Sequence, residues 1–142
     1  MKSSARNQFS GVVTAVRNGA INDEVELEIA PGQRLVSTVT HESRQVLKLE
    51  VGAKAMALVK ASSVLLVSDS AGMRFSARNQ LTGTVGAVTT GAVNSEVLVR
   101  LPGAARVVAI VTNASVASMG LRPGDEVMAM FKASSVVLAS EA

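Results

Sequence analysis

The sequence predicts an all-β protein built from two tandem, five-stranded, OB-like β-barrels, each with one short helix. Three observations predict it: an internal repeat, segments in which polar and apolar residues alternate, and turn signals that divide each repeat into five such segments. We therefore expect a first domain at residues 1–70 and a second domain at residues 71–142.

The internal repeat is clearest in two polar blocks. Residues 4–8, Ser-Ala-Arg-Asn-Gln, reappear at 76–80, and residues 60–64, Lys-Ala-Ser-Ser-Val, reappear at 132–136, so both blocks are offset by 72 residues. The apolar segments between the blocks have diverged. Packing alone rarely demands identical Ser, Arg, Asn and Lys side chains, because these residues are mostly exposed. Identity confined to the polar blocks therefore indicates a shared binding role.

The strands are predicted from periodicity and turn residues. Residues 24–29 alternate polar and apolar side chains with a period of two, which is typical of a half-buried strand. Gly and Asn at residues 18–22, and Pro31-Gly32, mark the turns on either side. The first repeat is expected to hold strands at 8–16, 24–29, 34–39, 53–59 and 64–67, and the second repeat is expected to hold matching strands that include 96–101, 106–111, 126–131 and 136–139.

One short helix is predicted between the third and fourth strands of each repeat. Thr40 and Ser43 in the first repeat, and Thr112 and Ser115 in the second, are residue types that cap helix N-termini. Apolar residues follow them, and Gly52 or Pro123-Gly124 ends the segment.

Composition indicates a soluble, globular protein. The chain has 142 residues, of which 48% are hydrophobic and 18% are charged, and no apolar run approaches the length of a membrane span. The first residues do not form an apolar leader, so we expect a cytoplasmic protein. The absence of cysteine excludes disulfides, thiolate ligands and cysteine nucleophiles.

Charge and aromatic content argue against a nucleic-acid-binding role. Lys and Arg total 14 against 11 Asp and Glu, and the basic residues are scattered. Three Phe and no Trp or Tyr leave little for base stacking. An OB-fold nucleic-acid-binding module, or an oxyanion-sensing interaction module of a larger regulator, remains an alternative function.

Enzymatic activity is not expected. The chain has a single histidine, His41, with Asn113 at the matching position of the second repeat, and it has neither a GxSxG nor an HExxH motif. Gly86 and Gly91 are spaced like the glycines of a phosphate-binding loop, but the Lys-Ser/Thr of that motif is missing. We expect no catalytic residues and no direct ligands for a metal cation.

Four motifs in one order, present twice, give the chain a family resemblance. They are the Ser-Ala-Arg-Asn-Gln block, Gly-Ala-(Ile/Val)-Asn-x-Glu-Val, Thr-x-x-Ser before the helix, and Lys-Ala-Ser-Ser-Val. Together they resemble the Mop domain of molybdate-binding proteins, and two such domains resemble the tandem molbindins of the ModG type. The resemblance implies trimers that hold molybdate or tungstate at contacts between domains or subunits, for storage and homeostasis of the oxyanion.

The residue types suit this role, because a tetrahedral dianion needs converging hydrogen-bond donors and a few positive charges. The loops between the first two strands of each repeat are plain turns or a second class of oxyanion site, formed by Gly19, Ile21, Asn22, Gly91, Val93 and Asn94. Carried over from the family motif, the residues expected at the main sites are Ser4, Ala5, Arg6, Asn7, Thr40, Ser43, Lys60, Ala61, Ser62, Ser76, Ala77, Arg78, Asn79, Thr112, Ser115, Lys132, Ala133 and Ser134.

Overall fold

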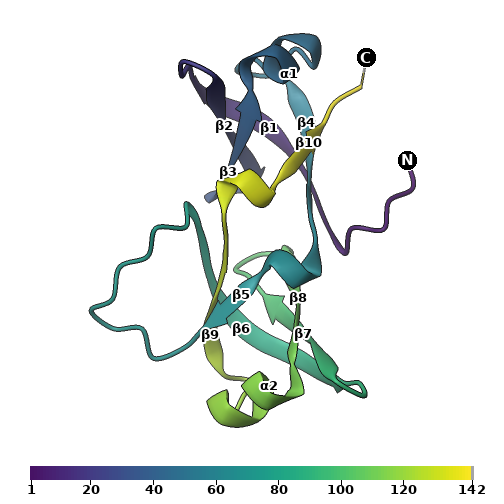
Figure 1. Cartoon of the computed structure of the whole chain (residues 1–142), viewed down its shortest axis with the longest axis vertical. Helices are drawn as coiled ribbons and strands as arrows, with labels where there is room; N and C mark the ends of the chain where they lie inside the picture. The colour runs from purple at the N-terminus through teal and green to yellow at the C-terminus, as the bar shows by residue number, and fades with distance from the viewer. Residues whose placement is uncertain (142) are drawn as a thin grey trace. The chain divides into compact units, whose positions relative to one another are not determined.

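Ten strands form two five-stranded antiparallel sheets in the computed structural model, which describes residues 1–141 (Figure 1). The predicted all-β fold, with five strands and one short helix per repeat, is confirmed. The first repeat contains β1 (Asn7–Arg17), β2 (Asn22–Ala30), β3 (Gln33–Thr40), α1 (His41–Val46), β4 (Lys54–Val59), the 3-10 turn η1 (Ala61–Ser63) and β5 (Leu65–Val67). The second contains β6 (Asn79–Thr90), β7 (Asn94–Arg100), β8 (Arg106–Thr112), α2 (Asn113–Met119), β9 (Glu126–Phe131), η2 (Ala133–Ser135) and β10 (Val137–Ala139).

The two repeats exchange their fifth strands. The strand order is β10-β4-β1-β2-β3 in one sheet and β5-β9-β6-β7-β8 in the other. The first compact unit therefore consists of residues 1–59 and the segment from Lys132 onward, and the second consists of residues 60–131. The predicted boundary between residues 70 and 71 separates the sequence repeats but does not separate the compact units. After its fourth strand, each repeat continues into the other unit, where its fifth strand joins the sheet.

Within the first unit, the two edge strands of the sheet come into contact. β10 touches β3 as well as pairing with β4, and the Ser37 hydroxyl donates to the Val136 carbonyl over 2.9 Å. In the second unit, β5 pairs with β9 and touches β8 in the same way. Contact between opposite edges of one sheet is what a closed barrel requires.

The predicted alternation of polar and apolar side chains determines which residues of β2 and β7 lie in the core. Val25 and Leu27 on β2 are fully buried, as are Val97 and Val99 on β7, while the residues between them face outward. The first strand of each unit carries a register shift at the same repeat position, between Val13 and Ala15 in β1. Such a bulge bends the strand and increases its twist, as a small barrel needs.

Two glycines allow the loops that join the first two strands of each unit to close tightly. A β-carbon at Gly19 would collide with the carbonyl oxygen of Asn22, and one at Gly91 would lie 2.6 Å from the carbonyl oxygen of Asn94. Both loops therefore fold back on themselves at a point that only glycine permits.

Candidate functional site

The Ser-Ala-Arg-Asn-Gln block leads into the first strand of each unit. Asn7 is only 2% exposed and lies opposite Val59 of β4, while Gln8 Nε2 donates to the carbonyl of Ala5 over 3.0 Å. The second unit repeats this geometry, with Asn79 buried opposite Phe131 and Gln80 bonded to Ala77 over 2.9 Å. The Asn and Gln of the block thus have structural roles, while its Ser and Arg side chains are exposed.

The Lys-Ala-Ser-Ser block forms a 3-10 turn in both repeats. The Ser63 N–H donates to the Lys60 carbonyl over 3.0 Å, Ala61 is buried, and the side chains of Lys60 and Ser62 are exposed. The first amides of such a turn have no partner inside it. The turn therefore presents hydrogen-bond donors next to an ammonium group, and the same description holds for Lys132, Ala133 and Ser134 in η2.

Strand exchange decides which predicted residues share a unit. The first unit contains Ser4–Asn7, Thr40 and Ser43 from the first repeat, and Lys132–Ser134 from the second. The second unit contains the remaining nine predicted residues, which are Lys60, Ala61, Ser62, Ser76, Ala77, Arg78, Asn79, Thr112 and Ser115. Each unit therefore contains the Ser-Ala-Arg-Asn block of one repeat and the lysine block of the other, while Asn7 and Asn79 pair with Val59 and Phe131, the residues directly before the lysine blocks of their own repeats.

Thr40 and Ser43 serve as a helix cap. Thr40 Oγ1 accepts from the Ser43 N–H over 3.1 Å and lies 2.8 Å from Ser43 Oγ, and Thr112 with Ser115 repeats the arrangement at α2. Thr40 also lies opposite Asn22, at the end of the sheet where β1 finishes. β1, whose 11 residues begin at Asn7, separates this group from Ser4–Arg6. Within the first unit, Thr40 and Ser43 therefore lie apart from the Ser-Ala-Arg-Asn block.

The second-class candidates lie beside the helix-start group. The His41 N–H donates to the Ile21 carbonyl over 3.0 Å, and the Asn113 N–H donates to the Val93 carbonyl over 2.9 Å. Ile21 and Val93, at matching positions of the two repeats, are large apolar side chains that are 77% and 71% exposed. The loop and the helix start therefore form one surface region in each unit, a juxtaposition that the sequence did not reveal.

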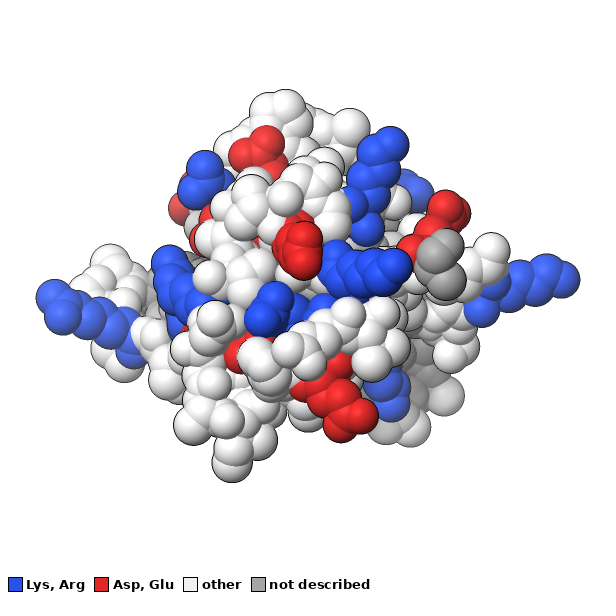
Figure 2. Space-filling model, turned by 90° about the horizontal axis from the view of Figure 1, so that it is seen from above, with Lys and Arg blue, Asp and Glu red and all other residues white. Residues whose placement is uncertain are grey.

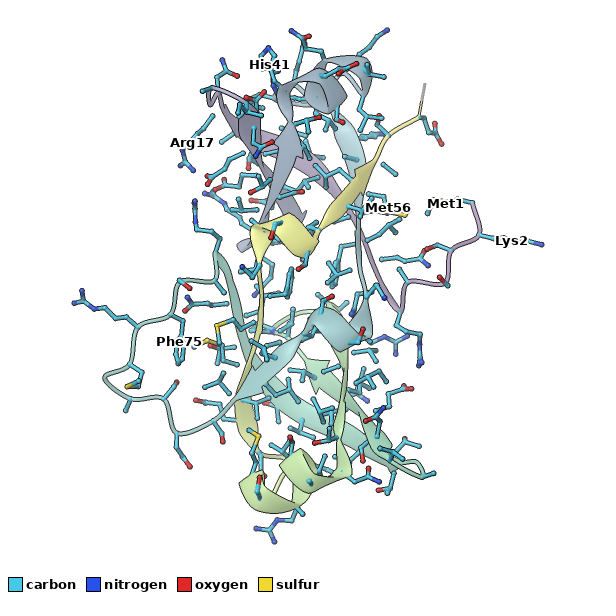
Figure 3. The ribbon with its side chains drawn as sticks, viewed as in Figure 1. Met1, Lys2, Arg17, His41, Met56 and Phe75 are labelled. Carbon is cyan, nitrogen blue, oxygen red and sulfur yellow. The ribbon has the colours of Figure 1, made fainter. Side chains whose placement is uncertain are left out.

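Sequence reasoning missed Asp23, whose carboxylate is fully buried beneath this region in the first unit. It accepts hydrogen bonds from Arg44 Nε, from His41 Nδ1 over 2.9 Å and from the Gly19 N–H over 3.0 Å. The bond from Arg44 is the main cause that lowers the pKa of Asp23 to about 2, against the opposing effect of burial. Figure 3 labels His41 at this end of the first unit. The available signal was an acidic residue at an inward-facing position of an alternating strand.

Surface charge is mixed over the face seen in Figure 2, where Lys and Arg side chains are separated by acidic and uncharged residues. Among residues 1–141, no group of three or more His, Cys, Asp or Glu side chains could hold a metal ion. No helix in that range is both long and apolar enough to cross a membrane.

Comparison with known proteins identifies the domains. The family model of the TOBE domain matches residues 3–66 and residues 76–138. The chain belongs to the TOBE domain family. Its two TOBE domains correspond to the two sequence repeats, and the predicted resemblance to the tandem molbindins is confirmed by the relatives below.

Two relatives of these TOBE domains are named as molybdenum proteins. The molybdenum transport protein ModE of Herbaspirillum seropedicae is 45% identical over 98% of this chain and 52% of its own length. The molybdenum-pterin-binding protein MopA of Rhodobacter capsulatus is 41% identical over 98% of the chain and 52% of its own length. The chain therefore spans about half the length of these relatives.

A solved structure resembles the whole chain. The cytoplasmic molybdate-binding protein ModG, in a form with molybdate bound, is 48% identical and superposes with a TM-score of 0.96 over 99% of this chain and 100% of its own. The relatives described here are binding and transport proteins by name, and none is named as an enzyme.

Proposed function

We propose that this protein binds molybdate or tungstate and serves as a cytoplasmic store that keeps the free oxyanion concentration steady. The observation that carries the proposal is the likeness, over nearly the whole chain, to the ModG structure with molybdate bound. A binding role without catalysis also agrees with a chain that contains one histidine and no cysteine.

The surface chemistry of the two polar blocks supports oxyanion binding. A tetrahedral dianion accepts hydrogen bonds on all sides and is best held by several donors and one or two cations. The exposed hydroxyls of Ser4 and Ser62, the guanidinium of Arg6 and the ammonium of Lys60 provide such groups, and the second copy of each block repeats them. We assign the main sites to these blocks.

We further propose that the protein forms a homo-oligomer, most simply a trimer, in which the sites lie at contacts between copies. Two observations support assembly. Large apolar side chains are exposed at matching repeat positions, as in Ile21 and Val93 and in Leu65 and Val137. Units of this size also bury a comparatively small fraction of their surface alone.

Calorimetric titration with molybdate, beside sulfate and phosphate and with the solution mass determined, tests the proposal. We expect saturable molybdate binding by an oligomer and a much weaker response to sulfate. Absence of heat with every oxyanion, confirmed by equilibrium dialysis, would reject the oxyanion-binding function.

DNA binding is the second candidate function, because a relative at 34% identity is the DNA-binding transcriptional dual regulator ModE of Escherichia coli. The chain covers only 53% of that protein. Filter binding at low salt separates the two functions, since retention of nucleic acid without oxyanion binding would favour the second.

A further inference from the structure

The two units differ in how the loop between their first two strands is attached to the helix. In the first unit the attachment is ionic and buried, and in the second it is neutral. Asp23, His41 and Arg44 occupy the positions that Ser95, Asn113 and Val116 occupy in the other repeat. Outside this region, the two units share the threonine helix caps, the 3-10 turns and the pairing register of the first strand with its two neighbours.

In the first unit, one carboxylate holds both the loop and the helix. Asp23 takes donors from the Gly19 N–H at the start of the loop and from His41 and Arg44 on α1. Arg44 also donates to the Asn18 side chain over 3.2 Å. Another loop conformation would take the Gly19 donor from a buried carboxylate and the Asn18 acceptor from Arg44, whose side chain is only 16% exposed.

In the second unit, an amide replaces the ion pairs. Ser95 Oγ donates to Asn113 Oδ1 over 2.5 Å, and Asn113 Nδ2 donates to the Gly91 carbonyl over 2.9 Å. The link again joins the strand, the loop and the helix start, but it carries no charge. The chain therefore attaches this loop to the helix in two ways, by ion pairs in the first unit and by neutral hydrogen bonds in the second.

We propose that Asp23 is a positioning residue for oxyanion binding by the first unit, because it fixes the loop at residues 18–22 in the one conformation that presents its outward groups to a ligand. The inference rests on the proposed function, since this loop is the candidate for the second class of site. Asp23 itself does not contact the oxyanion; it acts through Gly19 and α1.

A graded set of variants tests this role. Asp23→Ser with Arg44→Val removes both buried charges together and places the residues of the second unit at these positions. Adding His41→Asn completes the neutral attachment. We expect amide exchange of Gly19 to become about tenfold faster or more in the double variant, since charge-assisted bonds are lost. The triple variant is expected to restore slow exchange.

Binding is followed in the same variants by the amide shifts of Ile21 and Asn22 during molybdate titration. The double variant should weaken the response of these amides about tenfold, and the triple variant should recover it. Glu42→Gln, which changes an exposed charge on the same helix, is the control and should change neither readout.

The outcomes separate this inference from the proposed function. If molybdate shifts no amide of the wild-type protein, the proposed function fails, while Gly19 exchange still reports on positioning. The positioning role is overturned, although the function stands, if molybdate shifts only amides of the two polar blocks in the wild-type protein. It is also overturned if the shifts of Ile21 and Asn22 are the same in the double variant as in the wild type. Should the double variant not fold, Asp23→Asn takes its place with the same criteria.

Discussion

At the scale of single residues, Lys60 and Lys132 are the side chains whose removal best separates binding from folding. Both are exposed and directly precede 3-10 turns, so neither contributes to the core. We expect Lys60→Ala with Lys132→Ala to weaken molybdate binding at least about tenfold, since a charge-assisted hydrogen bond contributes roughly 1.5–3 kcal/mol. Isothermal titration and thermal melting measure the two effects separately.

Lys54→Ala is the matched control for these lysines, because Lys54 is also exposed at the end of a strand but lies outside both polar blocks. Equal losses of affinity in the control and in the double lysine variant would show that the lysines act only through general charge.

Asp23 gives the stability of the protein a specific dependence on pH. Its pKa falls from the ordinary value of 3.8 to about 2 in the folded protein, so its contribution is fully present above about pH 4 and is lost as the pH falls through about 2. Asp23→Asn should therefore be less stable than the wild type at neutral pH, and the gap should narrow between pH 4 and pH 2. Urea unfolding across this range measures the gap, and a constant difference would contradict the assignment.

The sequence pointed to functional candidates where the same polar residues occur in both repeats, and it missed Asp23, which occurs in only one repeat. The polar blocks stand out because they occur twice. Asp23 was an inward-facing acid, but its partner Arg44 lies 21 residues away and has Val116 in the second repeat. The identity of a buried ion pair depends on tertiary neighbours, which periodicity does not encode.

At the scale of elements, the two helices end differently. Lys48 and Gly120 occupy the same repeat position just after the helix, with φ values of 54° and 62°. This left-handed conformation suits glycine and strains lysine. Lys48→Gly should therefore stabilise the first unit by about 0.5–1 kcal/mol, after allowing for the greater freedom of glycine in the unfolded chain.

Chemical denaturation measures this change, and Gly120→Ala is its counterpart with the opposite expected sign. A destabilised Lys48→Gly variant would show that the lysine side chain makes contacts that outweigh the backbone strain.

Element positions were predictable because strands and turns have local signals. The alternation of polar and apolar residues predicted β2 and β7, and the threonine caps predicted where α1 and α2 begin. The exchange of fifth strands had no such signal. Residues 56–58 of β4 and 128–130 of β9 are similar in sequence, as are the two fifth strands, so either pairing satisfies the local pattern.

At the scale of the whole molecule, ligand binding should raise thermal stability. A ligand that binds only the folded or assembled protein stabilises it by mass action, by about 2.7 kcal/mol at a free concentration 100 times its dissociation constant. Melting should therefore shift upward with molybdate and not with equal concentrations of sulfate. A melting temperature that does not change with excess molybdate would count against binding to the folded state.

The exchanged strands make a mutation in one repeat act on the core built mainly by the other. Leu138 belongs to the second repeat, but it is buried in the first unit, where it lies opposite Ala57 of β4. Leu138→Ala should destabilise the first unit by about 2–4 kcal/mol, because it leaves a cavity in a closely packed sheet. Native-state amide exchange should show faster exchange in β1 and β4, with β6 and β7 unchanged.

Leu66→Ala, at the matching position of β5, should have the converse effect, with faster amide exchange in β6 and β9 and unchanged exchange in β1. If each variant instead loosens the strands of its own repeat, the fifth strands are not exchanged in solution.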